Sequence, residues 1–219
     1  MFSIFDPSTP NFLSSNWLSV GLFTALVPAT FWVSPNRASS IWAGASNYIF
    51  KEFLPLVKKY PFVLVIPAAL FTFIACNNVV GLAPYIFTGT SQLALTISLA
   101  LPLWSALMVY GWFNNTSNLL VHLIPHSTPS LLMPFMVLIE TVSNIIRPLT
   151  LAVRLTANMV AGHLLIVLLN SADPNTPLSL FPLLFSAKLA LLALEIAVAF
   201  IQAYVFSVLV TLYTAEFTT

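Results

Sequence analysis

The chain has 219 residues, of which 59% are hydrophobic and only 6% are charged, and its mean hydropathy is +0.96. A soluble domain carries roughly 25% charged residues, so this composition predicts an integral membrane protein and excludes an ordinary soluble one. The formal net charge of +1 excludes the broad basic surface that nucleic-acid binding requires.

The first predicted elements lie between residues 12 and 59. No charged residue occurs between Asp6 and Arg37, and the apolar stretch over 12–33 predicts a first transmembrane helix. In residues 37–59, apolar side chains recur at three- and four-residue steps, and polar or charged side chains fill the other face. This pattern predicts an amphipathic helix that lies in the membrane interface.

The middle of the chain carries no Asp, Glu, Lys or Arg from residue 60 to residue 139. Two further spans are predicted there, over 62–80 and 92–112, and the turn-rich sequence GLAPYIFTGTS joins them. The polar stretch over 114–130 then predicts a loop.

Two long apolar segments, 131–170 and 178–215, close the chain. As a helix each would extend ~60 Å, whereas the hydrocarbon layer is only ~30 Å thick. Each must therefore tilt strongly or break, and Pro148 is the expected site of a kink. The sequence thus predicts an all-α integral membrane protein of one domain, with five transmembrane helices, one interfacial amphipathic helix, and a last pair that is long, strongly tilted and antiparallel.

Basic residues predict the orientation. Arg37, Lys51, Lys58 and Lys59 cluster in the first connection against the single acid Glu52. Loops that are rich in Lys and Arg stay on the cytoplasmic or matrix side of the membrane. We therefore expect the N-terminus outside, and both the C-terminus and this connection inside.

Ionisable side chains inside the last two segments are the candidate functional residues. On insertion scales each costs at least ~2.5–3.5 kcal/mol at the centre of a membrane. Glu140, Arg147 and Arg154 recur at seven-residue steps, as do Lys188, Glu195 and Gln202. Seven residues advance a helix by about two full turns, so each trio forms one stripe. The first long segment carries Glu140, Arg147, Arg154 and His163, and the second carries Lys188 and Glu195, followed by the uncharged Gln202.

The register of the predicted hairpin relates the two stripes. A register that brings Arg154 to Gln202 also brings His163 nearly opposite Glu195. However, His163 lies about half a turn around the helix from Arg154, so a bend or intervening water would be needed for Glu195 to serve that face. Asn158 and Gln202 can hydrogen-bond the guanidinium or water.

These groups differ in what they can do with a proton. Arg154 stays protonated in a protein and is therefore a fixed cation, whereas Glu140, Glu195 and His163 can each gain or lose a proton. Exchangeable groups on both sides of a fixed cation predict two proton-accessible zones with a barrier between them.

Structural readings stay open beside this one. Lys188 can extend to the headgroups, Arg147 can be purely structural, and His163 can be a hydrogen-bonded core histidine. A bis-histidine haem site needs histidines on facing spans, and only one histidine lies within a predicted span, so neither haem nor another cofactor is expected. The single cysteine, Cys76, is expected to be a small buried apolar side chain.

Two stretches resemble a known family. LIETVSNIIRPLTLAVRLTANMVAGHLL (Leu138–Leu165) and ALEIAVAFIQAYVFSVLVTLY (Ala193–Tyr213) are similar to subunit a of the rotary F-type ATP synthase in its mitochondrial form. The resemblance follows the segment order of the whole chain and is strongest over 131–215. RLTANMVAGH is its most specific part.

The resemblance implies a stator subunit with two offset half-channels that load and unload a carboxylate on a rotating ring of c subunits. In that family the arginine at the position of Arg154 faces the ring carboxylate and blocks a direct leak. The other implied site residues are Gln202 and Asn158 beside the arginine, His163 and Glu195 on the entry side, and Glu140 nearer the exit. Arg147 and Lys188 match no firm family role.

The resemblance also implies partners and a location. The partners are the c-ring, other stator and membrane subunits of ATP synthase, the lipid bilayer and protons. The location is the mitochondrial inner membrane, crossed several times, with the N-terminus in the intermembrane space and the C-terminus in the matrix. The chain has no nucleotide-binding GxxxxGKT, so ATP chemistry is expected on partner subunits and this chain is not an enzyme.

Two other functions compete with this one. A self-contained proton-coupled secondary transporter would have its site between broken helices at the midplane, but the chain has no evident inverted repeat. A purely structural subunit would use its buried charges for assembly alone.

Overall fold

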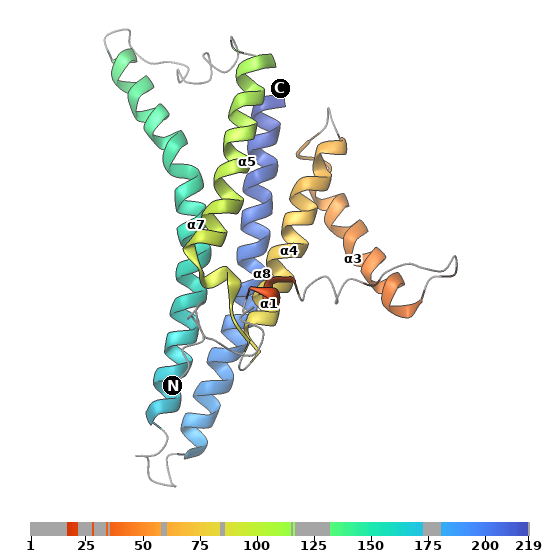
Figure 1. Cartoon of the computed structure of the whole chain (residues 1–219), viewed down its shortest axis with the longest axis vertical. Helices are drawn as coiled ribbons and strands as arrows, with labels where there is room; N and C mark the ends of the chain where they lie inside the picture. Colours follow the sequence, from red (N-terminus) through yellow and green to blue (C-terminus); the bar gives the residue numbers. More distant parts are fainter. Residues whose placement is uncertain are drawn as a thin grey trace.

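The computed structural model describes residues 17–21, 28, 34, 36–57, 61–83, 86–114, 116, 132–172 and 181–218. Every regular element in this part of the chain is a helix, as the all-α prediction requires (Figure 1). In chain order they are α1 (Leu18–Gly21), α3 (Arg37–Phe53), the 3-10 helix η1 (Pro61–Leu64), α4 (Val65–Gly81), the 3-10 helix η2 (Gly89–Ser91), α5 (Leu93–Asn114), α7 (Met133–Ala172) and α8 (Phe181–Thr218).

Four of the described helical segments are long and apolar enough to cross a membrane. They are Phe62–Gly81, Leu93–Asn114, Met133–Ser171 and Phe181–Ala215. Apart from the short α1, most of the first predicted span, 12–33, lies outside the described residues. A fifth span therefore stays a prediction.

The predicted amphipathic segment forms α3. The Asn36 side chain accepts a hydrogen bond from the Arg37 backbone N–H, 2.7 Å away, at the start of the helix. At the other end, Phe53 is buried against Leu64, and its ring centroid lies 6.3 Å from that of Tyr204 on α8. The rest of α3 diverges from the bundle (Figure 1), so only its last turns are fixed by core packing.

The two long segments form unbroken helices of 40 and 38 residues. The alternative of a broken helix is therefore wrong for α7, although α7 bends near its middle (Figure 1). Pro148 lies inside α7 and has no N–H, so the carbonyl of Asn144 loses its usual helical donor. This is a common physical cause of a bend.

The spans pack in alternating directions, with α7 and α8 antiparallel (Figure 1). α4 lies against α8 and α5 against α7, while η2 reaches α4, α5 and α7. Side chains from all four long helices form one buried apolar cluster. Its members are Leu70, Ile74, Ala75, Ala100, Leu151, Ala152, Leu155, Ala203, Phe206 and Val210. This cluster sets how α7 and α8 are rotated about their axes, and so decides which side chains meet.

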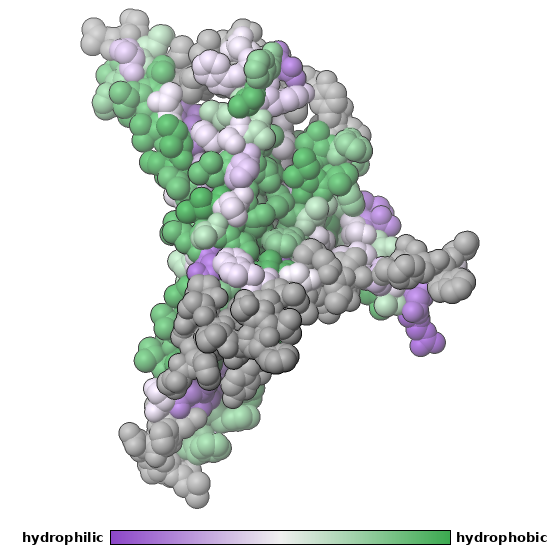
Figure 2. Space-filling view, viewed as in Figure 1, coloured by the Kyte–Doolittle hydropathy of each residue, from purple (hydrophilic) through white to green (hydrophobic). Residues whose placement is uncertain are grey.

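Large hydrophobic side chains are also abundant on the outside of the bundle. Figure 2 shows them over much of the face that α4, α5 and α7 present. Leu138, Leu168 and Leu183, for example, are 59%, 64% and 66% exposed. Such a surface is stable against lipid or against apolar partner proteins rather than against water.

Candidate functional site

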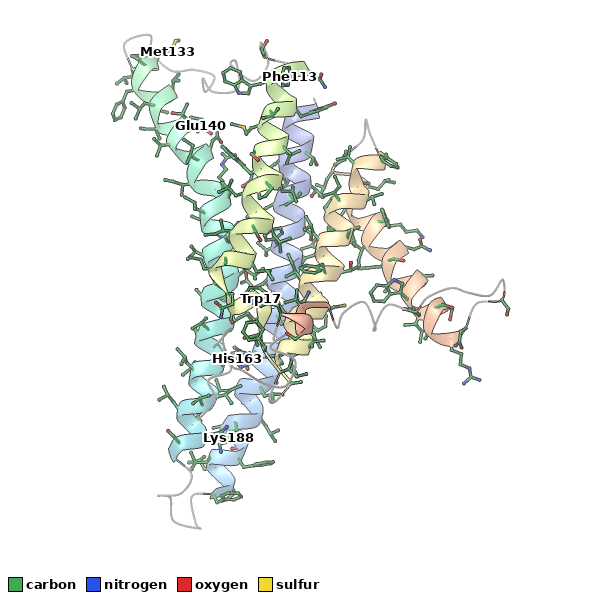
Figure 3. All side chains as sticks on the ribbon, in the orientation of Figure 1. Trp17, Phe113, Met133, Glu140, His163 and Lys188 are labelled. Atoms are coloured by element: carbon green, nitrogen blue, oxygen red, sulfur yellow. The ribbon has the colours of Figure 1, made fainter. Side chains whose placement is uncertain are left out.

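The candidate residues are spread along the length of the α7–α8 pair. Figure 3 shows Glu140 toward one end of the bundle, with His163 and Lys188 toward the other. Arg154 belongs to the middle of the forty-residue α7. The site is therefore elongated and follows the helix axes.

Arg154 and Gln202 lie at the same level of the two helices. Both line one shallow hollow, together with apolar residues of α7 and α8. The structure thus brings these two residues together, in agreement with the register derived from the sequence. Arg154 itself is exposed on the surface of the chain. Its guanidinium makes no hydrogen bond or ion pair with the side chains of the described residues.

Glu195 is buried against α7. Its side chain is only 6% exposed and lies against Gly162, where an added Cβ would be 2.8 Å from the Glu195 Cδ. A larger residue at this position would require the Glu195 side chain to shift. Neither carboxylate oxygen has a hydrogen-bond partner among the described residues, which is costly for a buried group and typical of a site that holds water or exchanges protons.

His163 is also buried, at 8% exposure, whereas Arg154 is exposed, so the two lie on different sides of α7, as the half turn between them predicts. Met159 lies one turn before His163 on α7. A Cβ built on Gly81 of α4 would be 3.7 Å from the Met159 Cε and 2.9 Å from the Thr88 Cγ2, so Met159 faces these two residues. Helical periodicity therefore places His163 on the side of α7 that faces the segment leading into η2. Gly162, the neighbour of His163, lies directly against Glu195.

A second glutamate occupies the other end of the pair in a different environment. Glu140 accepts a hydrogen bond from Arg147, with 3.3 Å between Oε1 and Nη2, and both side chains are about one third exposed. The Arg147 guanidinium carbon lies 5.6 Å from the centroid of the Tyr213 ring on α8. The sequence put Glu140 and Arg147 on one stripe, and their seven-residue spacing was the signal that could have found the pair.

Asn158 and Lys188 complete the predicted set, and both are half-buried. Asn158 follows Arg154 by one turn of α7, and Lys188 precedes Glu195 by two turns of α8. Among the described residues, no group of three or more His, Cys, Asp or Glu could hold a metal ion.

One buried polar residue was missed from the sequence. Asn78 of α4 is fully buried, and its Nδ2 donates to the Ala199 backbone carbonyl of α8 at 3.3 Å. Ala199 lies one turn from Glu195, so this bond holds α4 close to the buried carboxylate. The adjacent asparagines Asn77 and Asn78, inside an otherwise apolar span, were the available signal.

These features define a multi-spanning helical membrane protein whose ionisable groups lie along a pair of long helices. Comparison with known proteins narrows the class. The family described as ATP synthase A chain matches residues 14–215. ATP synthase subunit a of Drosophila simulans and that of Drosophila melanogaster are each 51% identical to this chain over 221 aligned residues, covering 99% of this chain and 97% of the relative. Subunit a of Locusta migratoria is 50% identical over 219 residues, with the same coverage.

The chain belongs to the ATP synthase subunit a family, in its mitochondrial form. It is accordingly a multi-pass inner-membrane subunit of the membrane sector, associated with other ATP synthase subunits, with a role in proton transport. It is not itself catalytic, since the chemistry on ATP takes place in other subunits.

Proposed function

We propose that this chain is the stator of the proton path, with two offset half-channels that load and unload a carboxylate on a rotating c-ring. The observation that carries the proposal is the position of Arg154. Its guanidinium is exposed on the outside of the bundle, in the middle of a helix apolar enough to cross a membrane. A cation at this depth is stable only beside an anion or water, and a carboxylate on a neighbouring rotor would supply the anion.

The surface around Arg154 supports close approach of another helix. Ala157 and Ala161 follow Arg154 by three and seven residues, and both are exposed. On α8, Ala197 is exposed as well. Small side chains allow the backbones of membrane helices to come close together, so a rotor helix could bring a carboxylate to the guanidinium.

The two proton-accessible zones follow from the groups on either side of Arg154. Glu195 and His163 lie toward the connection between α7 and α8, and Glu140 lies toward the opposite end. With the predicted orientation, the first zone opens to the intermembrane space and the second to the matrix, and the N-terminus and C-terminus lie on those two sides respectively. Gln202 and Asn158 would order the guanidinium and water between the zones.

Arg154 separates the zones electrostatically. It cannot give up its proton, and it repels a free proton that enters the space between them. Each proton that leaked across would dissipate ~2.3 kcal/mol per 100 mV of membrane potential. A ring carboxylate passes Arg154 only in its deprotonated form, paired with the guanidinium, and the protonated carboxylates travel the other way round the ring. A proton therefore crosses only when the ring turns.

The test is Arg154→Ala in the intact complex. Proton-driven ATP synthesis in inner-membrane vesicles should fall below detection, while the amount of assembled complex on native gels stays unchanged. Arg37→Ala is the matched control, because Arg37 is an exposed arginine at the start of α3, outside the described spans, and it should leave synthesis unchanged. Undiminished synthesis in Arg154→Ala would refute the proposal.

A further inference from the structure

The proton path as proposed gives no role to Arg147, although the structure places it between two residues of that path. Arg147 shares a stripe with Glu140 and Arg154, seven residues from each. It donates to the Glu140 Oε1 at 3.3 Å and lies over the Tyr213 ring at 5.6 Å. One guanidinium thus joins the acid of α7 to an aromatic ring of α8.

The contact with Tyr213 explains why Arg147 stays within the bundle. A lone arginine on a transmembrane helix would extend toward the headgroups. Here the electron-rich face of an aromatic ring attracts the cation, and the ion pair compensates its charge. Arg147 is therefore held from two sides, by a carboxylate of its own helix and by a ring of the neighbouring helix.

The backbone beside this pair adds a further polar group. Pro148 directly follows Arg147 and cannot donate to the carbonyl of Asn144. Asn144 lies one turn after Glu140 and about one turn before Arg147, on the same side of α7. The Asn144 carbonyl without its helical donor is a further acceptor on the stripe of Glu140 and Arg147.

We propose that Arg147 is a positioning residue for Glu140, and this inference rests on the proton path proposed above. Arg147 holds the carboxylate through Oε1, and Tyr213 holds the guanidinium in turn. The hydrogen bond from Arg147 engages Oε1, and Oε2 is the oxygen that would exchange with water and with protons that leave the Arg154 region. Arg147 never carries the proton, because guanidinium does not titrate in proteins.

The decisive experiment compares Glu140→Gln, Arg147→Gln and the double variant in the intact complex. Proton-driven ATP synthesis per assembled complex is measured in inner-membrane vesicles at a fixed membrane potential. Each single variant should slow synthesis about threefold to fivefold, a size appropriate for a partly exposed ion pair. The double variant should be no slower than Glu140→Gln, because a residue that acts only through Glu140 has nothing left to position.

Conservative variants separate positioning from a structural role. Arg147→Lys keeps a cation that can reach the carboxylate and the ring, and it should restore at least half of the rate lost in Arg147→Gln. Tyr213→Phe keeps the aromatic ring and should retain most of the rate, whereas Tyr213→Leu removes the ring and should reproduce the loss seen in Arg147→Gln. Arg37→Gln, the same exchange on the exposed part of α3, is the matched control and should have no effect.

The outcomes that overturn the inference are distinct from those that overturn the proton path. A double variant clearly slower than Glu140→Gln, or an Arg147→Lys variant as slow as Arg147→Gln, shows that Arg147 acts independently of Glu140. If Arg147→Gln alone fails to assemble, the double variant and Tyr213→Leu still test the inference. The double variant replaces the acid together with its partner, and Tyr213→Leu keeps the Arg147 cation, so neither leaves the Glu140 carboxylate unpaired. Normal synthesis in all of these variants, with Arg154→Ala inactive, rejects the role of Arg147 and leaves the proton path standing.

Discussion

The two ends of the α7–α8 pair hold a glutamate in opposite ways. Glu195 is 6% exposed, lies against a glycine and has no hydrogen-bond partner among the described residues. Glu140 is about one third exposed and is paired with Arg147. The first carboxylate depends on protonation or water for its stability, whereas the second is already stabilised by a cation.

This difference has a functional meaning for the proposed path. A buried carboxylate without a compensating cation is sensitive to every change in its surroundings. A partly exposed and paired carboxylate can exchange with water and tolerates change better. The comparison therefore predicts that perturbing the Glu195 end costs more proton transport than perturbing the Glu140 end.

The largest effect is expected from Glu195→Gln. The amide has nearly the same shape as the carboxyl group but cannot exchange a proton, so proton-driven ATP synthesis should fall about 100-fold or more, as for a lost general acid or base. The amount of assembled complex on native gels should stay the same. Glu52→Gln on the exposed part of α3 is the matched control, and an equal loss in Glu140→Gln would break the comparison.

An intermediate effect is expected from Gly162→Ala. The new methyl group would lie 2.8 Å from the Glu195 Cδ and must displace the carboxyl group. This displacement should lower ATP-driven proton pumping about tenfold. The overpacking should also cost ~1–3 kcal/mol of stability. Gly44→Ala on α3 is the matched control, because no atom lies within 4 Å of a Cβ added there. Normal pumping by Gly162→Ala would mean that Glu195 does not need this position.

The smallest effect is expected from Asn78→Ala, which removes the bond from α4 to the Ala199 carbonyl. Hydrogen bonds between membrane helices contribute about 0.6–1.7 kcal/mol, so the purified complex should lose activity at a lower temperature while its initial rate at low temperature changes little. Asn47→Ala, at an exposed position of α3, should leave the thermal inactivation curve unchanged. An unchanged curve for Asn78→Ala would assign the bond no stabilising role.

Several features of the fold were predictable from the sequence because they depend on local pattern. Long gaps between charges predicted segments that correspond to α4, α5, α7 and α8, and the three- and four-residue periodicity of 37–59 predicted α3. The seven-residue spacing predicted the stripe that Glu140 shares with Arg147. The constant register of an antiparallel pair predicted the approach of Arg154 to Gln202, which line the same hollow.

Other features could not be read from spacing. Helical period alone does not say how far α7 is rotated toward α8. The register placed His163 nearly opposite Glu195 and did not single out Gly162 as a neighbour of that carboxylate. That rotation is set by side chains distant in the sequence, such as Ala100 of α5 and Ile74 of α4, which pack in the same core as Leu151. The placement of Tyr213 over Arg147 depends on the same packing.

The sequence by itself determined that this protein is a helical membrane protein with a fixed cation between exchangeable groups, because hydropathy, charge spacing and helical period are properties of the chain. Only the tertiary structure decided that one glutamate lies buried against a glycine and that the other is held by an arginine stacked on an aromatic ring. The physical reason is that a helix can rotate about its axis without changing its sequence pattern, and close packing among four helices selects one rotation.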